Sequence, residues 1–198
     1  MKGAHYCGKS VLIPIQPYWV FLIIARLMDW NIPQEKTIEV RKNFPRDSAW
    51  NRKTLIYCSK NRRSFKRIPV QYQPFMRKLM GKVIGEFVCN QIDEIKPFGL
   101  EDPVAFEKQS CMRGNEIMRY LGGLYGFGWH ISDLKIYDKP KELGEFRTPC
   151  PSKFASEYAC SVGYRGCPYF TEEDNGIFGC SKEGLTRPPQ SWFYVEEI

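Results

Sequence analysis

The sequence predicts a single α+β domain built on a small, partly closed β-barrel. Short runs rich in β-branched and aromatic residues recur along the chain, one strongly apolar helix comes early, and aromatic residues make up 15% of the 198 residues. Hydrophobic residues at 43% and charged residues at 26% are ordinary for a globular chain and can fill a real core. This composition excludes a coiled coil, a collagen-like chain and wholesale disorder.

The first predicted elements are a strand and a helix. Ser10 to Pro14 is a short apolar run, and Pro17 suits the first turn of a helix, where its missing N–H is not needed. From Tyr18 to Asp29 the apolar residues recur with helical spacing. The residues expected on one face of this helix are Phe21, Ile24, Leu27 and Met28.

The apolar stretch from Val11 to Trp30 does not predict a membrane span. Pro14 and Pro17 interrupt it, and it carries Arg26 and Asp29, whereas a spanning helix needs about 20 mostly apolar residues. The start of the chain also lacks the pattern of a signal peptide. We therefore expect a cytoplasmic protein with no membrane partner, in which a disulfide framework is disfavoured.

Most of the remaining elements are predicted strands. One helix is expected from Phe106 to Leu121. The runs that alternate or are rich in β-branched and aromatic residues are Lys36–Lys42, Thr54–Ser59, Lys82–Cys89, Trp129–Tyr137 and Ser191–Glu196.

The eight cysteines fall into different contexts. Cys58 and Cys89 lie inside apolar strand-like runs, where cysteine behaves as a small buried hydrophobe. Four others cluster near the C-terminus and could form a structural zinc site, although none of their spacings is Cys-x-x-Cys: Cys150, Cys160, Cys167 and Cys180. The other interpretation is a Gly- and aromatic-rich excursion with incidental cysteines. No other cofactor is expected.

Positive charge is concentrated in one segment. Residues 41–82 hold 13 Lys or Arg and one acidic residue, Asp47, in a chain whose net charge is +7, so the rest is net acidic. This asymmetry is the electrostatic footprint of a polyanion-binding site, and interleaved aromatic residues could stack on bases. A solvated basic loop is the plainer alternative.

The segment from Glu35 to Lys42 is the leading candidate for site chemistry. Strand alternation puts Thr37, Glu39 and Arg41 on one face, and Lys36 can join them at a bent strand start. A Lys, a Glu and an Arg around one cleft could bind a phosphate or polarise a carbonyl, with the Glu as acid or base. The alternative is an edge strand that carries charges against aggregation.

These motifs, in this order, resemble the ASCH family. The resemblance rests on the run Ser10–Ile15, the Pro17-Tyr18 helix start, and the strands Leu55–Ser59 and Val83–Phe87 around the segment from Glu35 to Arg41. The family signature Gly-x-Lys-x-x-Glu-x-Arg is matched at Lys36, Glu39 and Arg41, with Gln34 in place of the Gly. Residues 187–195 resemble the closing strand of bacterial and phage-borne members.

The resemblance implies one PUA-like domain over residues 1–198, a small β-barrel flanked by helices. Its core is residues 8–138 with a closing strand in 185–198, and residues 139–184 form a Cys-containing insertion before that strand. The family's cleft lies between the early helix and the barrel, and Lys36, Glu39 and Arg41 would line it.

The function expected from charge and resemblance together is RNA or nucleotide binding in a basic cleft, the ligand being RNA or a modified nucleoside or nucleotide. Lys36 and Glu39 would select the base, Tyr57 would stack on it, and Ser59 could contact base or sugar, although Tyr57 and Ser59 also fit ordinary strand alternation. The residues expected to neutralise phosphates are Arg41, Lys42, Lys60, Arg62, Arg63, Lys66 and Arg67.

The alternative function is a hydrolase acting on a modified nucleoside, or a ribonuclease. Some similar family members are amidohydrolases on acylated cytidine, and those have a Thr where this chain has Glu39. Lys36 and Glu39 would then be the catalytic acid and base, with Glu86 as a further candidate carboxylate. A protein-interaction module that uses residues 60–67 is a third interpretation.

Overall fold

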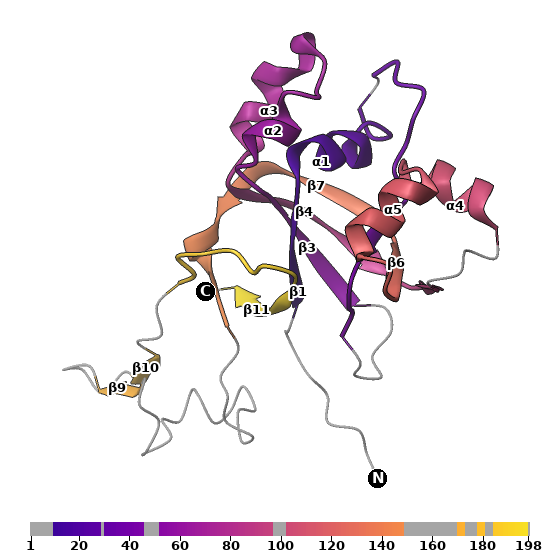
Figure 1. Cartoon of the computed structure of the whole chain (residues 1–198). Coiled ribbons are helices and arrows are strands. Elements are labelled where there is room, and N and C mark those ends of the chain that lie inside the picture. The colour runs from indigo at the N-terminus through magenta and orange to yellow at the C-terminus, as the bar shows by residue number, and fades with distance from the viewer. Residues whose placement is uncertain are drawn as a thin grey trace.

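The structure is a computed structural model of the whole chain. It describes residues 10–28, 30–45, 52–96, 102–148, 170–172, 178–180 and 184–197. Helices and strands alternate irregularly along these segments, so the fold is a mixed α+β fold (Figure 1). The predicted cysteine cluster lies in the part of the chain for which side chains are not described.

A six-stranded sheet forms the centre of the molecule. Its strand order is β7-β4-β3-β1-β11-β8, in which β1 and β3 are parallel and the other neighbours are antiparallel. The strands are β1 (Ser10–Ile15), β3 (Arg52–Cys58), β4 (Lys82–Cys89), β7 (Ser132–Glu142), β8 (Phe146–Arg147) and β11 (Phe193–Glu197). The predicted strands that correspond to β1, β3, β4 and β11 are confirmed, with shifts of a few residues at their ends.

A three-stranded sheet lies beside the first, with the order β2-β6-β5. Its strands are β2 (Ile38–Arg41), β6 (Gly126–His130) and β5 (Ile92–Ile95), and two further short strands, β9 (Phe170–Glu172) and β10 (Phe178–Cys180), pair with each other. The strand pairings of the described residues give these separate sheets, and they do not close into a ring of strands. The predicted barrel is therefore seen only as two neighbouring sheets.

The chain passes from one sheet to the other at Ile131. The single strand predicted from Trp129 to Tyr137 is wrong, because β6 ends at His130 and β7 begins at Ser132. Ile131 donates its backbone N–H to the Thr37 carbonyl and is buried. Periodicity cannot reveal such a crossing, since the alternation of apolar residues continues through it.

Helix α1 (Pro17–Ile24) covers one face of the six-stranded sheet. It begins at Pro17 as predicted but ends earlier, and residues 25–28 form turns. Its buried residues point in every direction around the axis rather than along one face, and Leu27 is 50% exposed. The prediction of one apolar face that includes Leu27 is therefore wrong, because the helix is enclosed on all sides by the core.

The helix predicted from Phe106 to Leu121 is two helices. They are α4 (Pro103–Ser110) and α5 (Gly114–Leu121), and the break falls at Cys111, whose φ of 56° is in the left-handed region. The two helices pack on the three-stranded sheet through Phe106, Ile117 and Leu121. In Figure 1 they lie together over β6.

The core is split by the six-stranded sheet. Alternate residues of β1 and β3 belong to different clusters, as the pleat requires: Ile13 and Ile56 pack with α1, whereas Leu12 and Leu55 pack with Phe146 on the other face. The turn η2 (Leu143–Glu145) lies on that second face and leads into β8.

Residues 59–81 join β3 to β4 and are called the excursion below. They contain α2 (Arg62–Phe65), η1 (Val70–Tyr72) and α3 (Gln73–Leu79), which stand together beside α1 in Figure 1. Asn61 caps α2 by accepting a hydrogen bond from the Ser64 N–H at 3.0 Å. Since β3 and β4 are adjacent and antiparallel, a short hairpin loop would suffice to join them.

In the described part of the chain, we find no helix that is long and apolar enough to cross a membrane.

Candidate functional site

The structure brings Lys36, Glu39 and Arg41 together as a buried ionic cluster. Only 1% of Lys36, 6% of Glu39 and 5% of Arg41 is exposed. The Lys36 ammonium donates to the Ile38 carbonyl at 2.7 Å and to the Ser110 carbonyl at 2.8 Å, and it lies 3.4 Å from a Glu39 carboxylate oxygen. Lys36 thus ties β2 to the C-terminal end of α4, where a cation is favourable.

Arg41 completes the cluster from the other end of β2. Its Nη2 lies 3.2 Å from Glu39 Oε1 and donates to the Pro14 carbonyl at 2.6 Å. The guanidinium therefore links β2 of the small sheet to the end of β1 in the large sheet. Both oxygens of Glu39 are engaged, one by each cation.

The cluster carries an excess of positive charge, since two cations share one carboxylate. Burial lowers the pKa of Lys36, while the Glu39 carboxylate acts in the opposite direction. The Trp19 ring, whose centroid is 5.1 Å from Lys36 Nζ, adds a cation–π contact on the side of α1. A buried excess charge of this kind is stable only where neighbouring groups accept hydrogen bonds from the N–H groups of the cations.

Two donors beside the cluster have no partner. Among the described buried side-chain atoms, Arg41 Nε, Trp129 Nε1 and Ser59 Oγ make no hydrogen bond. Trp129 stands opposite Glu39 in the β2–β6 register, so its side chain shares the face that carries Glu39 and Arg41. An unpaired buried donor costs about 1–3 kcal/mol, which an acceptor atom of a water or a ligand would offset.

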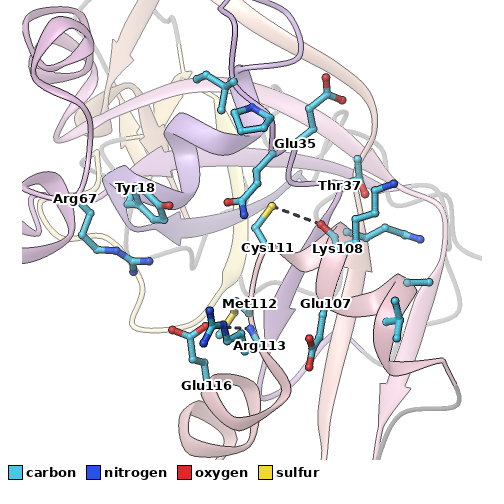
Figure 2. A pocket seen from close by; sticks show the side chains of 16 residues that line it. Tyr18, Glu35, Thr37, Arg67, Glu107, Lys108, Cys111, Met112, Arg113 and Glu116 are labelled. Atoms are coloured by element: carbon cyan, nitrogen blue, oxygen red, sulfur yellow. Dashed lines mark hydrogen bonds between the residues drawn. The ribbon is translucent and has the colours of Figure 1, made fainter.

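An open cavity of about 880 Å³ lies next to this cluster (Figure 2). One wall is formed by Tyr18, Arg67 and the segment from Ile32 to Glu35, and the other by residues of α4 and α5. Thr37 and Cys111 lie between the walls. Lys36, Glu39 and Arg41 are not among its lining residues, so the cluster supports the cavity from behind.

The charged residues that line the cavity balance one another. They are the three cations Arg67, Lys108 and Arg113 and the three carboxylates Glu35, Glu107 and Glu116. Glu107 accepts a hydrogen bond from the Gly114 N–H at 2.5 Å, and Glu116 accepts one from the Arg113 N–H at 3.0 Å. These two carboxylates hold the start of α5 in place, and the cavity itself is not strongly basic.

Arg67 joins the cavity to the basic surface. Its guanidinium lies 3.9 Å from the centroid of the Tyr18 ring and 4.9 Å from that of Trp19. It comes from the excursion, whose cations Lys60, Arg62, Arg63 and Lys66 are all exposed. Lys42 is also exposed but lies by α5, where its Nζ is 5.5 Å from the Tyr120 ring centroid.

The structure does not support a role in stacking for Tyr57. Its ring is 5% exposed and packs with Leu12, Leu55 and Phe146, on the face of the sheet opposite α1. A base could not reach it without opening the core. Ser59 is half-buried at the start of the excursion, and its backbone N–H donates to the Ile15 carbonyl.

Glu86 also lies away from the ionic cluster. It pairs with Leu55 across the sheet and so shares the face opposite α1. Lys53 contacts its carboxylate at 2.7 Å and the Tyr137 hydroxyl donates to it at 2.5 Å. Glu86 is therefore not a second carboxylate beside Lys36 and Glu39.

Sequence reasoning missed the α4–α5 wall of the cavity. Lys108, Met112 and Arg113 line it, yet they lie in a stretch predicted as one continuous helix. An available signal was Gly114, because a glycine inside a predicted helix is unfavourable and lowers the case for one continuous helix. A helix start at that point would have predicted the break, and with it a polar edge facing the early helix.

The cysteines of the described region are not poised for reaction. Cys58 and Cys89 are buried, as predicted, and this burial raises the pKa of Cys58 to about 12 and that of Cys89 to about 11. Within the described ranges, no group of three or more His, Cys, Asp or Glu side chains could hold a metal ion.

Several solved structures are similar to the chain, and they are ASCH structures. The ASCH protein from Zymomonas mobilis has 16% sequence identity and a TM-score of 0.46, over 68% of this chain and 73% of that chain. Two single-residue mutants of that protein give TM-scores of 0.45 and 0.46 at 15% and 16% identity, over 76% and 74% of their chains. These structures carry the name of the family that the sequence resembles. No protein-family model and no curated protein matches the chain.

Proposed function

We propose that the chain is an RNA- or nucleotide-binding protein of the ASCH type. The cations in and around α2, namely Lys60, Arg62, Arg63 and Lys66, contact the phosphates, and the base enters the cavity between Tyr18 and the α4–α5 wall. The observation that carries the proposal is the position of Arg67, which belongs to the basic excursion and also stacks on Tyr18 inside the cavity.

The charges of the excursion and of the cavity support a site in which the phosphates and the base of the ligand bind at different places. A phosphate needs unpaired cations, and the excursion contains no Asp or Glu. A nucleobase is neutral and planar, which suits a cavity whose charges balance and whose wall carries an arginine on a tyrosine. The basic cleft expected from the sequence is thus proposed as two adjoining surfaces, one cationic and one nearly neutral.

In this proposal Lys36, Glu39 and Arg41 act from behind the cavity. They hold β2 against the end of α4, because Lys36 bonds to Ser110, and against β1, because Arg41 bonds to Pro14. Thr37, Cys111 and Met112, which do line the cavity, would then contact the base. The three ionic residues set the shape that selects it.

The geometry does not favour the hydrolase alternative. An ammonium has three N–H donors, and that of Lys36 has three acceptors: two carbonyls and a carboxylate. Both oxygens of Glu39 are likewise paired with cations. Neither group is free to accept or deliver a proton, as acid–base catalysis requires.

Fluorescence anisotropy with labelled single-stranded RNA, duplex RNA and DNA tests the proposal. We expect single-stranded RNA to bind at about 50 mM salt and to weaken steeply towards about 150 mM. Arg67→Ala should weaken binding roughly tenfold, because it removes a phosphate contact and the stack on Tyr18. Arg187→Ala, which removes an exposed arginine far along the sequence, is the matched control.

Two results would overturn the proposal. One is the absence of binding to all three nucleic acids at low salt together with no binding of free nucleotides. The other is equal loss of affinity in Arg67→Ala and Arg187→Ala, which would reduce the interaction to non-specific attraction by a cationic protein.

A further inference from the structure

The outer face of η1 and α3 carries a shallow hollow that is separate from the cavity. Its volume is about 540 Å³, and it is lined by Val70, Gln73, Pro74, Arg77 and Lys78. None of these residues lines the cavity. Val70 is 77% exposed, so the fold leaves a β-branched apolar side chain in water at this point.

The inner side of the same elements is firmly packed. Met76 and Leu79 are buried in the main core. The Trp30 ring lies 4.7 Å from the Tyr72 ring and 5.5 Å from the Phe75 ring, centroid to centroid. These contacts hold the excursion without help from Val70 or Pro74, so the hollow is a preformed surface that the core does not need.

The rim of the hollow is cationic and lacks acidic partners. Arg77 and Lys78 are exposed, and within the described residues no carboxylate lies within ion-pair distance of either. The Arg77 guanidinium instead lies over an aromatic ring, 5.5 Å from the centroid of Phe65. The charge of the rim is therefore available to a molecule that docks there.

We propose that this face is a docking surface for an acidic segment of another protein, which places one apolar side chain in the hollow. The apolar floor supplies the anchor, and Arg77 and Lys78 supply the charge complement to acidic residues on either side of it. The surface is independent of the nucleic-acid site proposed above, which uses Arg67 and α2.

The chemistry of the floor favours a protein over a nucleic acid. Val70 and Pro74 present aliphatic groups, and neither offers the π face on which a base stacks. The aromatic side chain of α3, Phe75, is 37% exposed, but it does not line the hollow, and its ring meets the Trp30 ring edge-on at 87°. A leucine-like side chain fits such a floor, because burying it removes apolar area of both partners from water.

A labelled synthetic peptide of about 12 residues, rich in Asp and Glu with two leucines, is the probe. Its matched control replaces both leucines with serine. Fluorescence anisotropy should show that the leucine peptide binds the full chain at least tenfold more tightly than the serine peptide. Val70→Asp and the double variant Arg77→Glu/Lys78→Glu should each weaken that binding at least tenfold.

The control for charge is Lys135→Glu/Lys139→Glu on β7, which should leave peptide binding unchanged. Val70→Ser, with thermal melting of every variant, separates loss of docking from loss of folding. Two outcomes would overturn the proposal: no peptide binding, or equal binding of the leucine and serine peptides. If the peptide does not bind and Val70→Asp weakens the binding of single-stranded RNA, the hollow belongs to the nucleic-acid site instead. Failure of the RNA proposal shows instead in Arg67→Ala, which leaves the hollow intact.

Discussion

The ammonium group of Lys36 joins the Ile38 carbonyl of β2, the Ser110 carbonyl at the end of α4 and the Glu39 carboxylate. Removing it would leave the Ser110 and Ile38 carbonyls without this donor inside the core. We expect Lys36→Met to lower the free energy of unfolding by about 3–5 kcal/mol, measured by urea denaturation. Lys42→Met, a change at an exposed residue of the same segment, should alter it by less than about 0.5 kcal/mol.

A Lys36→Met variant as stable as the parent would contradict this role. It would mean that a well-packed hydrophobe replaces the ion pair at no cost, as is known for some buried salt bridges. Lys36 would then not be needed to hold β2 against the end of α4.

The sequence predicted the meeting of Lys36, Glu39 and Arg41 but not their burial. Alternation along one strand is a local property, and it correctly suggested that the three side chains could converge. Burial depends on Trp19 and Ser110, which reach the cluster from distant parts of the chain. The same limit applies to Tyr57. Its strand was predicted correctly, but the sequence could not show that Phe146 and its neighbours bury the side chain.

Glu86 lies on the face of the six-stranded sheet opposite α1, and its carboxyl makes the free energy of unfolding depend on pH. Burial acts to raise the pKa of its carboxyl, but hydrogen bonds from Lys53 and Tyr137 outweigh this and lower the pKa below its ordinary value. A carboxyl with a lowered pKa in the folded state stabilises the fold above its ordinary pKa, and this stabilisation is lost as the pH falls through the lowered value.

We therefore expect Glu86→Gln to be less stable than the parent at neutral pH and to lose less stability on acidification. Urea denaturation from pH 7 downward measures both curves. Glu94→Gln, at an exposed residue of β5, is the control and should run parallel to the parent. Parallel curves for the parent and Glu86→Gln would show that the contacts to Lys53 and Tyr137 do not hold the carboxylate.

At the scale of elements, the boundaries that sequence reasoning missed are the ones that create the site. The break at Cys111 turns α4 and α5 into a wall of the cavity, and the crossing at Ile131 joins the two sheets. Neither point carries a Gly or Pro, the residues that usually mark a break. Tertiary contacts decide both, among them the bond from Lys36 to the Ser110 carbonyl.

Gly85 shows how closely β4 and β7 approach. A Cβ at this position would collide with the Lys135 carbonyl oxygen and lie 3.0 Å from Ile136 Cα, so the obstacle is backbone that cannot rotate away. The β4–β7 register shifts next to this residue, between Val83 and Gly85. We expect Gly85→Ala to lower the free energy of unfolding by about 1–3 kcal/mol.

Gly144→Ala is the matched control, because a Cβ there meets nothing within 4 Å. Its stability should stay within about 0.5 kcal/mol of the parent under the same urea denaturation. If both alanine variants were equally stable, the two strands would have room to separate, and the close approach at Gly85 would not constrain the sheet.

At the scale of the whole molecule, an excess of positive charge and a balanced set of charges lie on different elements. The excursion collects cations without a single acid, while the cavity beside it balances its charges. The sequence predicted the basic segment well, because composition alone reveals it. It could not predict that Arg67, alone among the cations of the fully described excursion, would line the cavity, since that depends on how the excursion packs against α1.

The position of these cations predicts how steeply the affinity for RNA falls with salt concentration. If Arg62 and Arg63 each neutralise a phosphate of single-stranded RNA, removing both lowers the number of released counterions by two. The slope of log affinity against log salt should then become shallower by about 1.4 in Arg62→Ala/Arg63→Ala. The loss of affinity should be similar for RNAs of different sequence, because phosphate contacts position a ligand without reading its bases.

Lys135→Ala/Lys139→Ala removes the same charge from β7 and so keeps the net charge of the two variants equal. We expect its slope to match that of the parent, since Lys135 stands opposite Glu86 on the face of the sheet away from α1, and both lysines lie outside the excursion. Equal slopes for the two double variants would mean that net charge alone attracts the RNA. A shallower slope only in Arg62→Ala/Arg63→Ala would fix the phosphate path on the excursion, next to Arg67, which lines the cavity.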